Sequence, residues 1–278
     1  MIYSFLKNII GNCLGIINMV YLYINLFFKY HFQYKKLYLE LDKLDFDDNN
    51  YNSGKIVDYN IHYGCNFSEK VKMKEIITFL KNENAEIYVL QEFPNIKFDN
   101  GKYLLYYFLK KLGIKYYHKE VIIKVCNIEY CSIILSKNNI ENVKVLNFKR
   151  WFCRLPNVCV SVKTLFNEEK TWISNVHLNS DITGYCQLSQ CKELKTHIHK
   201  LKEPHIILGD FNTPCSYESI KYLQQNFKLI KNKKRTYPSV FPIVKLDYCF
   251  TYNFNNKLSC MVRNIQLSDH LPLIIECL

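Results

Sequence analysis

Short apolar runs alternate with polar stretches from about Gly54 to the end of the 278-residue chain. The segments 55–61 (KIVDYNI) and 85–92 (AEIYVLQE) are rich in β-branched and aromatic residues, which predicts two strands of a sheet. Between them, apolar residues recur at helical spacing over 71–80 among lysines. This pattern predicts a helix there, with Ser68 as its N-cap.

The remainder of the chain continues in the same way. A longer helical pattern covers 184–201, and further strands are expected at 130–136, 158–166, 170–178, 205–210, 244–250 and 270–277. Because the strands are short and few long helices separate them, we expect a large mixed sheet system and not a regular doubly wound fold.

The first 36 residues have a different character. The stretch 8–28 carries no charged residue, and a helix needs about 20 apolar residues to span a bilayer. Its four asparagines are costly in hydrocarbon, and no small-residue cleavage site marks a signal peptide. We expect an apolar helix over 1–36 that associates with a membrane, or alternatively packs on the domain. Residues 37–53, which are rich in acidic side chains, are expected to link it to one domain over 54–278.

Composition adds little to the choice of partner. The net charge of +12 favours nucleic acid, a membrane surface or a phosphate-bearing substrate. Arginine, which is preferred for bidentate phosphate contacts, is scarce, and the abundant lysine is typical of an AT-rich coding sequence. The basic run 231–235 (KNKKR) is expected to be a solvated loop, with a phosphate-backbone contact as the alternative. The cysteines fit no zinc template, so we expect reduced thiols in an intracellular, reducing setting.

Polar side chains stand at the ends of the predicted strands. Each one has a simpler explanation as a turn former, a cap or a structural histidine. Strand ends are nevertheless where α/β folds place their sites, and carboxylate, amide and imidazole groups together suit a hard divalent cation and a phosphate. The candidates are Asn60, Glu92, His177, Asp210, Asn212, Asp247, Asp269 and His270.

Six ordered blocks around these residues resemble the endonuclease/exonuclease/phosphatase superfamily. The resemblance covers about residues 54–278, and the order and rough spacing of the blocks match. It implies a two-sheet α/β sandwich, four-layered and deoxyribonuclease I-like, with helices outside and a site at one edge between the sheets. The blocks are YNIHYG (59–64), LQEF (90–93), NVHL (175–178), GDFN (209–212), LDYCF (246–250) and SDHLP (268–272).

The resemblance also implies a metal site. Glu92 is expected to bind Mg²⁺, with Mn²⁺ as an alternative, and Asn60 and Asp269 to be direct or water-mediated partners. His62 stands where some nucleases of the family carry an acidic metal partner, and it is a candidate substrate contact. Arg154 is a second candidate for binding the substrate.

The catalytic roles follow from the same resemblance. Asp210 is expected to orient or deprotonate the attacking water, and Asn212 to hold this water or the phosphate. His177 and His270 are expected to contact the scissile phosphate. Asp247 is expected to hydrogen-bond His270, which fixes its tautomer and favours the imidazolium.

The stretch 206–214 (IILGDFNTP) explains how two of these residues act together. Residues two apart in an extended segment point the same way, so Asp210 and Asn212 are expected to face one water. Phe211 then packs behind them, and Gly209 lets the chain approach a neighbour closely.

Three functions are compatible with the sequence. The first is Mg²⁺-dependent cleavage of phosphodiester bonds in nucleic acid, which the charge and the basic run favour. The second is the same chemistry on a lipid or small phosphoester at a membrane, sphingomyelinase-like, which the apolar N-terminal segment favours. The third is a catalytically inactive binding module. We expect the first, performed by a monomer.

Overall fold

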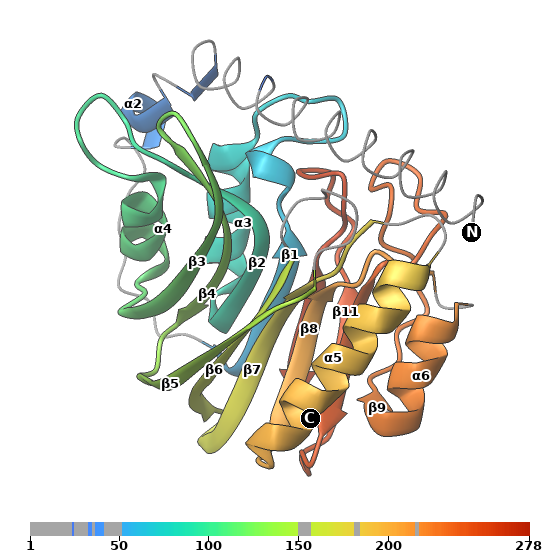
Figure 1. Ribbon diagram of the computed structural model, residues 1–278. Helices are drawn as coiled ribbons and strands as arrows, with labels where there is room; N and C mark the ends of the chain where they lie inside the picture. Colours follow the sequence, from blue (N-terminus) through green and yellow to red (C-terminus); the bar gives the residue numbers. More distant parts are fainter. Residues whose placement is uncertain are drawn as a thin grey trace, which may run out of the picture.

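Two mixed six-stranded sheets pack face to face with helices outside, in the computed structural model (Figure 1). The structure describes residues 52–149, 157–180, 184–214 and 217–278, together with 24, 33–34 and 37–41. The predicted two-sheet α/β sandwich is confirmed.

The first sheet contains the first four strands of the chain and the last two. In spatial order they are β11 (Leu258–Val262), β12 (Leu273–Cys277), β1 (Asn52–Asn60), β2 (Ala85–Ile96), β4 (Ile128–Ser136) and β3 (Tyr116–Val125). The second sheet contains the strands between them, in the order β5 (Ile140–Asn147), β6 (Val158–Phe166), β7 (Glu169–His177), β8 (His205–Asp210), β10 (Asp247–Tyr252) and β9 (Lys228–Leu229).

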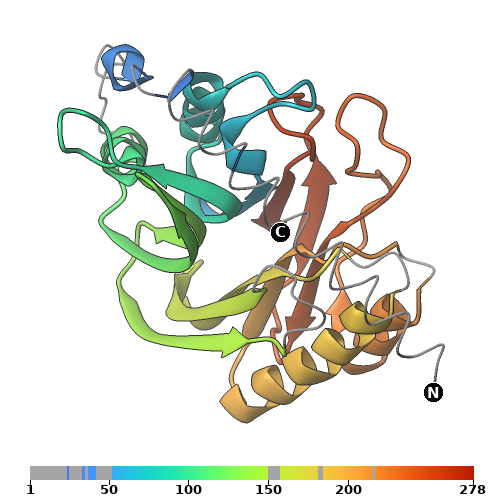
Figure 2. The same cartoon turned by 45° about the horizontal axis from the view of Figure 1, so that its top comes forward.

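Each sheet has its own pair of covering helices. Helices α3 (Met73–Glu83) and α4 (Leu104–Leu112) pack on the outer face of the first sheet. Helices α5 (Tyr185–Leu201) and α6 (Glu218–Asn226) pack on the outer face of the second, on the opposite side of the molecule (Figure 2).

Two short helices complete the described part. A 3₁₀ turn, η2 (His62–Gly64), follows β1, and α2 (Leu37–Leu41) lies within the segment predicted to be a linker. Both end residues of α2 are buried in the cluster on the outer face of the first sheet. Part of residues 37–53 is therefore attached to the domain.

The core between the sheets follows the two-residue period of the strands. Ile56 of β1 and Val89 of β2 point toward the second sheet, where Ile206 and Leu208 of β8 point back at them. The intervening Val57 points the other way, into the cluster beneath the helices. Because successive side chains alternate between the two faces, β1 and β8 continue this inward row up to their last residues.

The connectivity sets the edge at which the strands end. β1 and β2 are parallel and joined through α3, and β7 and β8 are parallel and joined through α5. All other paired strands in the described part are antiparallel. Two parallel β-α-β units thus bring their carboxyl ends to one edge of the sandwich, which is where α/β folds place their sites.

The start of the first long helix differs from the prediction. The helix begins at Met73 with Lys72 at the N-cap position, so the assignment of Ser68 as the cap is wrong. Ser68 lies instead in a turn closed by Asn66, whose Oδ1 atom accepts hydrogen bonds from the backbone N–H groups of Ser68 (3.1 Å) and Lys70 (3.0 Å). Side-chain to backbone bonds of this kind compete with helix formation, and here the turn prevails.

Two predictions fall on other parts of the chain. Arg154 and most of the apolar segment 8–28 lie outside the described residues. The substrate contact assigned to Arg154 and the membrane-associated helix assigned to the segment therefore stay predictions. Among the helices that the structure does describe, none combines the length and the apolar character that crossing a membrane requires.

Candidate active site

Three of the candidate residues are the last residues of inward-facing rows. Asn60, His177 and Asp210 end β1, β7 and β8. Two positions before Asp210, Leu208 belongs to the core between the sheets. Two positions before His177, Asn175 donates a hydrogen bond to a carbonyl of β2 in the opposite sheet (3.0 Å). The alternation of the strands therefore places each terminal side chain between the sheets at the same edge.

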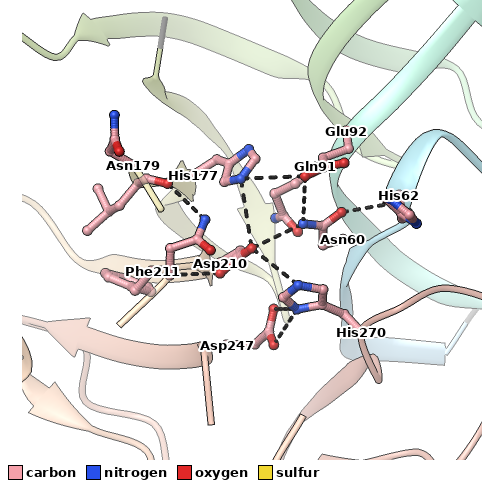
Figure 3. Close-up of polar contacts among 12 residues, drawn as sticks. Asn60, His62, Gln91, Glu92, His177, Asn179, Asp210, Phe211, Asp247 and His270 are labelled. Atoms are coloured by element: carbon pink, nitrogen blue, oxygen red, sulfur yellow. Dashed lines mark hydrogen bonds and ion pairs between the residues drawn. The ribbon is translucent and has the colours of Figure 1, made fainter. Parts of the chain in front are cut away.

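The second sheet aligns its polar residues across three neighbouring strands. His177 is paired in register with Asp210, and Asp210 with Asp247. The Nε2 atom of His177 lies 3.8 Å from Oδ2 of Asp210. His270, from the loop before β12, completes the row: its Nε2 lies 3.5 Å from the same Oδ2 (Figure 3). One carboxylate oxygen is thus flanked by both imidazoles.

Gly209 allows this row to form. Its φ is +135°, and a Cβ atom at this position would lie 2.0 Å from the carbonyl oxygen of Val176 on β7. The expectation that Gly209 permits a close approach of the chain is confirmed. Only glycine lets β8 lie against β7 here with the neighbouring Asp210 directed into the site.

Glu92 reaches the site through an irregularity of β2. Strict alternation would direct it away from the second sheet, since Leu90 belongs to the outer cluster. The register against β4 shifts between Leu90 and Phe93, and Glu92 has a φ of +55°. A bulge of this kind re-aims a side chain. As a result, Oε1 of Glu92 accepts a hydrogen bond from Nδ2 of Asn60 (3.3 Å) and lies 3.8 Å from Nε2 of His177.

Asn60 connects the two halves of the site. Its Nδ2 also donates to Oδ2 of Asp210 (3.1 Å), and its Oδ1 accepts from the backbone N–H of His62 (3.1 Å). Ser268, from the opposite end of the chain, donates to its backbone carbonyl (2.7 Å). These bonds hold the carboxylates of the two sheets at a fixed separation.

Asp269 and His62 lie at the rim of this arrangement. Nδ1 of His62 is 3.7 Å from Oδ1 of Asp269, and Oγ of Ser268 lies 3.1 Å from the same oxygen. The side chains of His62 and Asp269 are 18% and 17% exposed, so both face solvent at the mouth of the site. Of the ten residues assigned to the site from sequence, only Arg154 is not among the described residues.

Asn212 does not adopt the predicted geometry. Its φ is +48°, so the chain leaves the extended conformation and Asp210 and Asn212 do not point the same way by alternation. Its backbone N–H donates to Oδ1 of Asp210 (2.8 Å), and its side-chain amide donates to the carbonyl of Leu178 (2.9 Å). Asn212 therefore fixes the carboxylate through its backbone. Phe211 is buried behind the site, as expected.

The surroundings shift the pKa values of the carboxyl and imidazole groups of the site. Burial, with the charge of Asp269 second, raises the pKa of Glu92 to about 8. Burial also raises the pKa of Asp210. Burial alone would lower the pKa of His270, but the charges of Asp247 and Asp210 outweigh it and raise this pKa well above 6.5.

His177 has the opposite behaviour, because burial is the largest influence on it and lowers its pKa. At neutral pH the site therefore holds one imidazolium, on His270, and a neutral imidazole, on His177. The carboxyl groups around these two imidazoles are those of Glu92, Asp210, Asp247 and Asp269. Such an excess of acidic groups over cationic ones favours the binding of a cation.

The structure supports Glu92 as the place for a metal. Its Oε2 atom is buried and has no hydrogen-bond partner among the described residues. Asp210, Asp247 and His270 also offer ligand atoms within 4.8 Å of one another. However, Nδ1 of His270 is hydrogen-bonded to Asp247 (2.9 Å) and the raised pKa favours a protonated ring, which cannot ligate a metal. The donor set at Glu92, with further carboxylates nearby, suits a hard divalent cation.

Sequence reasoning missed residues that support the site from behind. Gln91 donates to Asp58 (2.9 Å) and to Asn175 (2.8 Å), which joins the two sheets through buried amides. Tyr237 packs its ring 5.0 Å from that of His270. The signal for the amides was present, since Gln91 and Asn175 are polar residues inside apolar strand runs.

Comparison with known proteins agrees with this geometry. A model of the Endonuclease/Exonuclease/phosphatase family matches residues 59–270, a span that contains every site residue described above. A search of curated proteins finds no match.

Several solved structures share the fold. An endonuclease/exonuclease/phosphatase family protein from Leptotrichia buccalis is 18% identical with a TM-score of 0.64, over 81% of this chain and 99% of that chain. A mannosyl-6-phosphatase from Bacteroides thetaiotaomicron is 14% identical with a TM-score of 0.62, over 81% of this chain and 100% of that chain. A truncated TDP2 from Caenorhabditis elegans is 17% identical with a TM-score of 0.63, over 81% of this chain and 97% of that chain. At these identities the likeness is one of fold.

Proposed function

Because the chain belongs to the endonuclease/exonuclease/phosphatase family, we propose that it is a divalent-metal-dependent hydrolase of phosphodiester bonds. Family membership supports phosphoester hydrolysis in general. The observation that carries the finer proposal is the position of Asp210, whose Oδ2 lies 3.5 Å from Nε2 of His270 and 3.1 Å from Nδ2 of Asn60. A carboxylate held between a cationic imidazole and an amide is placed to act on a water that attacks a bound phosphate.

Glu92 and Asp269 would hold the metal directly, with Asn60 orienting Glu92 through its amide. We propose Mg²⁺, with Mn²⁺ as an alternative. When bound, the ion supplies positive charge to the phosphate and so lowers the repulsion that an anionic ester presents to a nucleophile.

Side chains of the protein accept the proton of the attacking water and stabilise the charge on the phosphate. Asp210 accepts the proton of the attacking water, and its raised pKa makes it a stronger base than an exposed aspartate. His270, as the imidazolium, and His177, as a neutral donor, face the phosphate oxygens on which charge grows in the transition state. Asp247 keeps His270 in its charged form and in one orientation.

Two substrate classes are supported by different observations. The net charge of +12 and the exposed residues of the run 231–235 favour nucleic acid, which is the first candidate. A lipid or other small phosphoester is the second candidate, because Val240, Phe241 and Ile243 are exposed close to the site. Because one structural neighbour is a mannosyl-6-phosphatase, a sugar phosphate is a further substrate to test.

The test measures turnover by the full-length protein with Mg²⁺, with Mn²⁺ and with chelator. The substrates are bis-p-nitrophenyl phosphate, plasmid DNA, RNA, sphingomyelin and mannose 6-phosphate. We expect metal-dependent cleavage of at least one phosphodiester, and a loss on the order of 1,000-fold in Asp210→Asn at an unchanged melting temperature. Asp99→Asn, an exposed aspartate in a loop, is the matched control. Absence of turnover on every substrate would refute the enzyme proposal, and unchanged turnover in Asp210→Asn would refute the site.

A further inference from the structure

The loop between β9 and β10 carries apolar side chains into solvent. Val240, Phe241 and Ile243 are 45%, 74% and 51% exposed, and we call these three residues the apolar tip. Phe241 is among the most exposed large apolar side chains of the described part of the chain. Single exposed apolar residues are common, but three of them within four positions on one loop need an explanation.

The apolar tip is held in place by its own backbone. Tyr237 and Val244 pair across the base of the loop through two hydrogen bonds, from Tyr237 N to Val244 O (3.0 Å) and from Val244 N to Tyr237 O (2.9 Å). Within the loop, the N–H of Phe241 donates to the carbonyl of Pro238 (3.1 Å). These bonds fix the loop in a shape that keeps the tip away from the core, so the exposure belongs to the folded structure.

The same loop is attached to the candidate active site. The N–H of Ser239 donates to the carbonyl of Asp269 (2.7 Å), and the N–H of Leu271 donates to the carbonyl of Thr236 (2.8 Å). In Figure 2 the orange loop before β10 projects beside the red loop that precedes β12. Whatever surface the tip contacts is therefore brought next to His270, which lies between these two bonded positions.

The loop that carries the tip is also basic. Lys231, Lys233, Lys234 and Arg235 are exposed in the first part of this loop, and Lys245 lies near its end. No acidic residue occurs from 231 to 246. An apolar tip on a loop that carries basic residues and no acidic ones of its own is complementary to a surface that is anionic outside and apolar beneath.

We propose that the apolar tip inserts into the interfacial layer of an anionic phospholipid bilayer, while the adjacent basic residues contact the head groups. Val240 and Ile243 favour lipid over nucleic acid, because branched aliphatic side chains offer no flat face on which a base can stack. Phe241 does not distinguish the two partners, because its ring can insert into lipid or stack on a base. If the protein has the proposed phosphodiesterase activity, this orientation would present the site to a phosphoester at the membrane surface. Binding to vesicles does not depend on that activity and can be measured without turnover.

The first test measures binding of the full-length protein to vesicles of phosphatidylcholine with and without about 30% phosphatidylserine. We expect Val240→Ser/Phe241→Ser to weaken binding to the anionic vesicles by about tenfold, with turnover of bis-p-nitrophenyl phosphate unchanged. Leu165→Ser, at the far end of β6 and 38% exposed, is the matched control and should bind as the unmodified protein does.

The second test monitors the tip itself, because residues 8–28 could add a separate membrane contact. Phe241→Trp is expected to show a blue-shifted emission with anionic vesicles and quenching by brominated lipid, whereas Leu165→Trp is not. An unchanged Phe241→Trp emission on vesicles would overturn the proposal. A shift with single-stranded oligonucleotide and none with vesicles would overturn it too, and would assign the tip to nucleic acid. Loss of turnover on all substrates with vesicle insertion intact would refute the enzyme proposal alone.

Discussion

Nδ1 of His270 lies 2.9 Å from Oδ2 of Asp247, and both side chains are buried. The other ring nitrogen of His270, Nε2, faces Asp210, so His270 lies between two carboxylates of the second sheet. Their charges overcome the effect of burial and raise the pKa of His270 well above 6.5. At neutral pH a cation is thereby kept in the candidate active site.

Replacing Asp247 by asparagine should move the pH profile of the enzyme. A group with a raised pKa stays charged up to a higher pH, and its charge is lost as the pH rises through that pKa. In Asp247→Asn the pKa of His270 falls, so the alkaline limb of kcat/KM should shift to lower pH. We expect a loss on the order of 100-fold or more at pH 8. Asp99→Asn should retain the original profile, and an unshifted limb in Asp247→Asn would contradict the role of the pair.

Glu92→Gln should separate metal binding from stability. The unpartnered Oε2 atom and the pKa of about 8, caused chiefly by burial, indicate that the negative charge of Glu92 is unfavourable without a cation. We therefore expect the variant to be as stable as the original protein without metal, or slightly more stable. The original protein should gain about 3 kcal/mol when Mg²⁺ is present at 100 times its dissociation constant.

Thermal unfolding with and without Mg²⁺ measures this difference. Glu92→Gln should lose most of the metal-induced rise in melting temperature. Glu120→Gln, a half-exposed carboxylate on β3, should keep it. An equal rise in Glu92→Gln and the original protein would place the ion elsewhere.

The sequence was sufficient to predict the residues whose placement follows from strand periodicity. Asn60 and Asp210 end apolar strands, and the two-residue period that buries Ile56 and Leu208 also directs these polar ends between the sheets. The family resemblance then supplied the roles that periodicity cannot.

Periodicity failed where the backbone departs from regular conformations. Glu92 reaches the site only because β2 bulges at a residue with positive φ. The pattern of apolar residues in this strand does not predict a bulge. Asn212 adopts a left-handed conformation that breaks the alternation assumed for it. At Ser68 the turn formed by Asn66 overrides the capping pattern. These local choices depend on tertiary contacts that a single sequence does not contain.

Gly209→Ala should be strongly destabilising. A Cβ atom would lie 2.0 Å from the carbonyl oxygen of Val176, and a φ of +135° is itself strained for alanine. We expect a loss of about 3 kcal/mol or more in the free energy of unfolding, measured by urea denaturation. The control is Gly101→Ala, whose φ is +80° but whose Cβ would meet nothing within 4 Å. That variant should lose only about 1 kcal/mol, and equal losses would show that the close approach of β7 and β8 is unimportant.

His205 should make the protein sensitive to acid. The ring is fully buried, lies 2.6 Å from Oγ of Ser174 through Nε2, and stacks on Trp172. Burial lowers its pKa to about 3, so the folded protein keeps it neutral while the unfolded chain takes up a proton below pH about 6.5. Stability from this group is therefore complete above pH about 6.5 and is lost as the pH falls toward 3, at about 1.4 kcal/mol per pH unit.

Urea denaturation at pH 7 and pH 4.5 measures this loss. His205→Gln keeps an amide in place of the ring and removes the titration. Between the two pH values, the variant should lose about 2 to 3 kcal/mol less stability than the original protein. His118→Gln, at a partly exposed position on β3, is the control substitution. If His205→Gln and the original protein lost stability in parallel, the buried neutral imidazole would not be a source of acid sensitivity, because only a group that titrates differently in the two states can create such a dependence.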